Sequence, residues 1–231
     1  MKSVDLTFLY NGLNCRLVRT DRKTVAIICT PEGEVEIRSP KNTPETVIKR
    51  LIDQNRPWID ERLTAIRDAQ KDLLCTEDSI RLLGRWWEIR EGDRHDFGDS
   101  WIMIPKNAEN RKRAIDKSCR MLAKKVFGER VAYYAPLLGV KPSSVSVGWG
   151  ITRKWGSCDG LNNLYFTWKA LFCEARDVDY LVVHELSHIR YHNHGPRFWK
   201  KVSLFFPDYQ ECRARMAKMS ETVRVQGWVN Y

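Results

Sequence analysis

Four of the five histidines of this chain lie within eleven residues of one another, in the C-terminal quarter of the sequence. The first opens the sequence His184-Glu185-Leu186-Ser187-His188, which follows the apolar run 181–183. In an α-helix, residues four positions apart lie one above the other, with about 5–6 Å between their Cβ atoms. A helix over 178–191 therefore brings the imidazoles of His184 and His188 close enough to bind one metal ion.

The same stretch offers a third ligand and a base. His194 lies ten residues after His184, beyond the expected helix, where the chain can turn back toward the metal. His192 is the alternative third ligand. If the helix continued to residue 192, His192 would lie in one row with His188 along the helix axis, and the rings would not surround a metal ion. Three protein ligands with one water are typical of catalytic zinc, so we predict Zn²⁺ on His184, His188 and His194. Glu185 lies about 100° around the helix from His184, a position that suits a general base better than a ligand.

The rest of the sequence alternates between strand-like and helix-like segments. Strands are expected where β-branched residues are frequent and turn residues follow, within 4–38, 80–104 and 145–168. Helices are expected where apolar residues recur on one face: in 44–54, after Pro57, and in 109–134, 178–191, 198–206 and 208–219. This order predicts an α+β fold.

Charge and cysteine content limit the class of protein. The formal net charge of +10 favours polyanionic partners such as nucleic acid, although many basic enzymes bind none. The seven cysteines are odd in number, widely spaced and without a CxxC motif, so reduced thiols in the cytoplasm are expected.

No apolar run approaches the roughly 18–20 residues of a membrane span. Asp5 interrupts the N-terminal stretch that would otherwise be a candidate signal peptide.

The sequence 184–199, HELSHIRYHNHGPRFW, resembles the YgjP-like metallopeptidase domain, a relative of the SprT-type and WLM zinc proteases. The resemblance continues upstream in 153–158, RKWGSC, and downstream in 206–209, FPDY. Two residues depart from the family pattern: Lys154 replaces the usual arginine, and Gly195 stands where serine is common. Neither departure affects an expected zinc ligand.

The predicted elements and the resemblance together imply an α+β architecture in two parts. Residues 1–105 are expected to form a β-rich N-terminal subdomain with two helices. Residues 106–231 are expected to form a zincin-like metallohydrolase core, in which a small β-sheet accompanies the helices. The implied activity is zinc-dependent hydrolysis of a peptide bond, with a peptide or protein as the substrate and Glu185 as the general base.

Two other functions suit the same residues. At least some YgjP-like proteins are described as nucleotide pyrophosphatases, so a nucleoside triphosphate is an alternative substrate of the same zinc site. No Walker A loop is present, so phosphohydrolysis would depend on metal-activated water. A DNA-associated binding module with structural zinc is the second alternative, because the basic charge suits a nucleic acid.

Arg153, Lys154 and Trp155 are the expected substrate-binding residues. They lie in a predicted strand over 151–157, just before a turn and near the metal motif. In one interpretation the two cations contact an anionic group of the substrate. In the other they are solvated charges that protect an edge strand from aggregation. The free edge of that strand would accept an extended peptide by strand addition.

Overall fold

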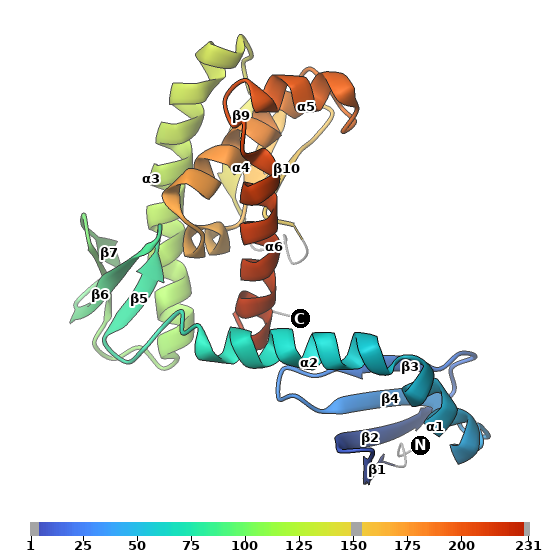
Figure 1. The fold of residues 1–231 in the computed structure, drawn as a ribbon. Helices are drawn as coiled ribbons and strands as arrows, with labels where there is room; N and C mark the ends of the chain where they lie inside the picture. The colour runs from blue at the N-terminus through green and yellow to red at the C-terminus, as the bar shows by residue number, and fades with distance from the viewer. Residues whose placement is uncertain (1–4, 149–153, 229–231) are drawn as a thin grey trace. The chain divides into compact units, whose positions relative to one another are not determined.

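The computed structural model describes residues 5–148 and 154–228 of the chain. These residues form two compact units, whose elements are drawn in Figure 1. The first unit contains Met1–Asp72 and Arg224–Trp228, and the second contains Leu73–Val223. None of the helices in the described part combines the length and the apolar character that crossing a membrane requires.

A four-stranded sheet and two helices make up the first unit. The strands are β1 (Asp5–Tyr10), β2 (Leu13–Thr20), β3 (Ala26–Cys29) and β4 (Val35–Pro40). Their order is β1-β2-β4-β3, with β2 and β4 parallel. Helices α1 (Glu45–Gln54) and α2 (Arg56–Lys71) follow the sheet. Alternate residues of β2 and one face of each helix are buried in a common core, and the helical faces are those that the periodicity of the sequence predicts.

The second unit contains two further sheets. One has the order β5-β6-β8-β7, from β5 (Ser79–Leu82), β6 (Arg85–Gly92), β7 (Asp96–Phe97) and β8 (Trp101–Pro105). The other has the order β10-β11-β9, from β9 (Ser144–Val147), β10 (Gly156–Cys158) and β11 (Asn163–Phe166). Its helices are α3 (Arg111–Leu138), the 3₁₀ helix η1 (Trp168–Phe172), α4 (Ala175–His188), α5 (Pro196–Ser203) and α6 (Tyr209–Val225).

The long helix α3 organises the second unit. Asn110 caps its start by accepting a hydrogen bond from the backbone N–H of Arg113 at 2.9 Å, and Gly139 ends it with a φ of 68°. The helix packs against β8, β9 and α4. Phe127 in its middle stacks on Phe166 of β11, with 4.2 Å between ring centroids. Helix α3 thus holds α4 beside the sheet that contains β10, which α4 also contacts.

Helix α4 carries two of the histidines on its last turns. It begins and ends earlier than expected, at Ala175 and His188 rather than at 178 and 191. Tyr191 still donates its backbone N–H to Ser187 at 2.9 Å, so the chain makes one further turn before leaving the helix. Pro196 then starts α5 at a helix position that needs no N–H donor. The early end of α4 frees residues 189–195 to turn back.

The α+β class is confirmed by these helices and mixed sheets. The strand expected over 151–157 is shorter in the structure, because β10 contains only Gly156–Cys158 and Lys154 and Trp155 are not in a strand. Residues 151–153 lie outside the described residues. The expected division into a β-rich subdomain over 1–105 and a core over 106–231 stays a prediction. The compact units of the structure divide after Asp72.

Candidate metal centre

Three histidines converge at the end of α4. His184 and His188 project from its last two turns, and His194 returns from the segment between α4 and α5. One ring nitrogen from each lies within 4.8 Å of the other two. The Nε2 atoms of His194 and His184 are 3.0 Å apart. Two nitrogens that each bind a tetrahedral zinc ion at about 2.0–2.1 Å are about 3.3 Å apart, so this donor set fits zinc.

The other ring nitrogens have partners of their own. His188 Nδ1 lies 3.1 Å from the carbonyl oxygen of Tyr191, which only accepts, so Nδ1 carries the proton and Nε2 keeps its lone pair. The Tyr180 hydroxyl lies 3.3 Å from His184 Nδ1. When His184 binds a metal through Nε2, its Nδ1–H donates to that hydroxyl. Such partners fix the tautomer and orientation of a ligand.

The surroundings keep the three imidazoles neutral. Burial, and then the neighbouring positive charge of His188 and His194, lower the pKa of His184 to about 3. Burial also lowers the pKa values of His188 and His194. A neutral imidazole is the form that binds a metal, so the site is prepared for a cation without prior loss of protons.

Aromatic rings support the histidines from α5. Phe198, 1% exposed, lies 4.6–4.9 Å from the ring centroids of all three histidines. Trp199 stacks on His194 with 5.4 Å between centroids, and Tyr209 of α6 stacks on the same indole at 4.8 Å. Rings packed in this way have few alternative orientations, so His194 is held beside α4 although it lies outside a helix.

Glu185 lies beside the histidines and is 5% exposed. Burial raises the pKa of its carboxyl to about 8, while the positive charge of Lys154 opposes the rise. Gly156 of β10 lies against it: a Cβ at position 156 would be 2.8 Å from Glu185 Oε1. Within the described part of the chain, the carboxylate accepts no hydrogen bond. It is therefore a buried, basic group that remains free to act on a substrate or a water.

A cleft of about 870 Å³ opens over the histidines and Glu185. Lys154, Trp155 and β10 form one part of its wall, and α6 forms another part with residues from Gln210 to Ser220. His192 lines the same cleft without joining the histidine cluster. Of the expected substrate-binding residues, Lys154 and Trp155 thus lie at the cleft, and Arg153 lies outside the described residues. Their role stays a prediction, as does the assignment of the zinc ligands.

The α6 wall contains a cation that the sequence analysis did not identify. The guanidinium of Arg213 lies over the ring of Trp199, with 4.8 Å between its carbon and the ring centroid. Its positive charge contributes to the lowered pKa values of His184 and His194. No sequence signal links position 213 to the histidine motif, because the contact depends on how α6 packs. Tyr180, by contrast, lies four residues before His184 and its contact follows from helical spacing.

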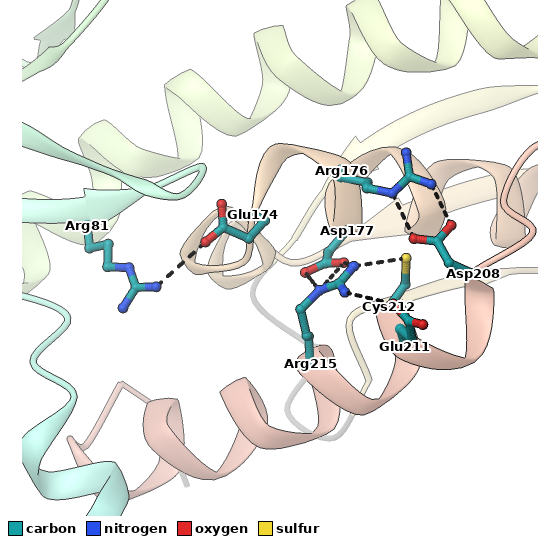
Figure 2. A network of polar contacts seen from close by, with 8 residues as sticks. All are labelled: Arg81, Glu174, Arg176, Asp177, Asp208, Glu211, Cys212 and Arg215. Atoms are coloured by element: carbon teal, nitrogen blue, oxygen red, sulfur yellow. Dashed lines mark hydrogen bonds and ion pairs between the residues drawn. The ribbon is translucent and has the colours of Figure 1, made fainter.

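Ion pairs tie α6 to the start of α4 (Figure 2). Asp177, 1% exposed, accepts hydrogen bonds from Arg215 Nη2 at 2.6 Å and from Arg215 Nε at 3.1 Å. Asp208, just before α6, accepts one from Arg176 Nε at 2.9 Å. These contacts set the α6 wall of the cleft relative to the helix that carries the histidines.

Comparison with known proteins identifies a family and one similar solved structure. The sequence profile described as YgjP-like, metallopeptidase domain, matches residues 23–219. Among solved structures, one similar chain is the metallopeptidase zymogen of Pyrococcus abyssi abylysin, at 18% identity and a TM-score of 0.36. The similarity covers 39% of this chain and 90% of that one. No curated protein matches the sequence significantly.

Proposed function

The chain belongs to the YgjP-like metallopeptidase family, and from this premise we propose that it is a zinc-dependent peptidase that uses Glu185 as its general base. His184, His188 and His194 would hold the zinc ion. The observation that carries the proposal is the convergence of three neutral imidazoles within 4.8 Å, in the same cleft as a buried carboxylate. When bound, zinc supplies a Lewis acid that polarises a carbonyl and acidifies water.

Glu185 has the position and the environment of a proton carrier. Its carboxylate lines the cleft next to the histidines and accepts no hydrogen bond from other described residues. Burial makes it more basic than an exposed glutamate. The carboxylate takes a proton from the attacking water and then delivers it to the leaving amine. Gly156 keeps the carboxylate in place, since no side chain separates β10 from it.

Strand β10 suits the binding of an extended peptide. It lies at the edge of its sheet in the described part, with β11 as its neighbour. Gly156, Ser157 and Cys158 all line the cleft. A substrate peptide that pairs with this edge would bring its backbone past Glu185 by strand addition.

The test compares the zinc-loaded protein with its Glu185→Gln variant on casein and a mixed peptide library. We expect the variant to keep its fold and one zinc per chain but to lose turnover by about 10³-fold or more, because general-base catalysis alone contributes about 10²–10⁴-fold. Glu129→Gln, an exposed glutamate on α3, is the matched control and should leave turnover unchanged. Lost zinc in Glu185→Gln, or full activity, would reject the role of the carboxylate.

A nucleoside triphosphate is the second candidate substrate. The observation in its favour is that two cations, Lys154 and Arg213, line the cleft. The same zinc-loaded preparation should be offered UTP. If UTP is turned over, Lys154→Ala should reduce that turnover by about 10²–10³-fold, as expected when an electrostatic stabiliser of a phosphoryl group is removed. Turnover of peptides without turnover of UTP supports the peptidase.

A further inference from the structure

Arg213 occupies a position in the cleft that the proposed chemistry does not use. It lies on α6, which lines the cleft together with Lys154, Trp155 and β10. Its guanidinium lies over Trp199, whose indole stacks on His194. The guanidinium and a candidate zinc ligand thus contact the same indole. Stacking on an indole orients a guanidinium and leaves its N–H groups available at the edge.

The neighbouring arginines pair with carboxylates, whereas the partner of Arg213 in the described part of the chain is the ring of Trp199. Arg215 pairs with the buried Asp177, and Arg176 pairs with Asp208 (Figure 2). Arg213 is exposed and forms no ion pair with any carboxylate in residues 5–148 or 154–228. Its contact with Trp199 links α6 to α5, but its charge is not neutralised by an acidic side chain of the described residues. An unneutralised guanidinium that faces a cleft is suited to bidentate binding of a carboxylate from another molecule.

The charged residues that line the cleft are mostly positive. Among its described lining residues Glu185 is the only carboxylate, and it is 5% exposed. Lys154 acts electrostatically on Glu185 and His188, whereas Arg213 acts on His184 and His194. Both cations line the cleft, so positive charge lies close to the histidine cluster from two separate segments of the chain. A cleft with such charges attracts anionic substrates and repels cationic ones.

The wall beyond Arg213 leaves room for a continuing chain. Ala214, Ala217 and Ser220 line the cleft on the same helix with short side chains, and Met216, which also lines it, is buried at 4% exposure. A substrate that reaches Arg213 therefore need not end there. This favours a carboxylate carried on a side chain over one at the end of a peptide.

We infer that Arg213 binds an acidic side chain of the substrate near the scissile bond, so that the enzyme prefers acidic peptides. This inference rests on the proposed peptidase function and adds its substrate class. Arg213 is then a specificity-determining residue, and Trp199 is the platform that orients it. Lys154 adds to the attraction from another part of the cleft wall.

The first test uses three peptides that differ only at one position beside the cleavage site, which carries Glu, Gln or Lys. We expect the wild type to cleave the Glu peptide with a kcat/KM about 10-fold or more above that of the Gln peptide, the range of one charged contact. Arg213→Gln should remove the preference, and Arg213→Glu should reverse it in favour of Lys. Such a reversal is not produced by mere loss of structure. Lys218→Glu, the same charge change at an exposed residue of α6 outside the cleft, should leave the preference intact.

The second test measures binding without hydrolysis. A fluorescent Glu-containing peptide is titrated with zinc-loaded Glu185→Gln protein, and its anisotropy is recorded. Adding Arg213→Glu should weaken binding by about 10-fold or more, whereas adding Lys218→Glu should not. Binding that depends on Arg213 while the wild type cleaves no peptide would support this inference and reject the peptidase. Three results would overturn the inference. Peptides could be cleaved without a charge preference, cleavage could require a free C-terminal carboxylate, or Arg213 could matter only for UTP.

Discussion

Gly156 and Glu185 lie so close together that a single methyl group does not fit between them. A Cβ at position 156 would lie 2.8 Å from Glu185 Oε1 and 2.9 Å from its Cγ. Strand β10 therefore lies directly against the proposed base. The contact restricts where the carboxylate can lie, and it depends on the absence of a side chain at this position.

Gly156→Ala should reduce turnover while the metal stays bound. The new methyl group must push the Glu185 carboxylate aside, and a base displaced by about 1 Å loses on the order of 10²-fold in rate. The measurement is kcat with a peptide substrate, together with zinc content. Gly160→Ala is the matched control, because a Cβ at position 160 would contact nothing within 4 Å. Equal activity of the two variants would show that Gly156 does not position the base.

Single histidine substitutions should separate the two candidate third ligands. His184→Ala, His188→Ala and His194→Ala should each abolish stoichiometric zinc binding, since each removes one of the clustered nitrogens. Zinc at a hundredfold excess over its Kd should stabilise the wild type by about 3 kcal/mol, because it binds the folded state. Thermal unfolding with zinc and with a chelator measures this effect. The His192→Ala variant should still be stabilised by zinc. If His192→Ala loses this stabilisation and His194→Ala keeps it, His192 and not His194 is the third ligand.

Tyr180→Phe should weaken zinc binding without changing the ligands. The hydroxyl lies 3.3 Å from His184 Nδ1, and loss of such a partner typically costs about 10–100-fold in metal affinity. Competition with a zinc chelator measures the affinity. Tyr134→Phe, which removes a hydroxyl 3.2 Å from Asp179, is the control and should leave zinc affinity unchanged. Unchanged affinity in Tyr180→Phe would mean that the hydroxyl does not support the ligand.

Arg215→Ala should destabilise the second unit and impair the cleft. The substitution leaves the buried carboxylate of Asp177 without its main partner. We expect the free energy of unfolding to fall by about 1–2 kcal/mol, which is less than for a fully buried pair because Arg215 is itself partly exposed. The α6 wall would then be less well held, so peptide kcat/KM should fall as well. Urea unfolding checks the stability. Arg176→Ala, the control, breaks the more exposed pair with Asp208 and should lower the free energy of unfolding by less than about 1 kcal/mol. An equal decrease in both variants would contradict this account.

Much of the candidate site follows from local spacing. His184 and His188 converge because a helix has about 3.6 residues per turn. The apolar residues before them indicate that this helix is buried, whichever elements it packs against. The α+β class follows equally from local patterns, since β-branched segments with turn residues predict strands and recurring apolar residues on one face predict helices. The end of α4 was misplaced because Ile189 and Arg190 suit a helix as well as the turn that they make.

The sequence by itself predicted which residues would supply the chemistry, and for His184, Glu185 and His188 the reason is spacing within two turns of one helix. Only the tertiary structure decided what surrounds them. Gly156 faces Glu185 because β10 contacts α4, and Arg213 reaches the cleft because the ion pairs of Arg176 and Arg215 hold α6 beside α4. These contacts join residues far apart in the chain. They are set by packing and burial over the whole unit, which no local pattern of residue types records.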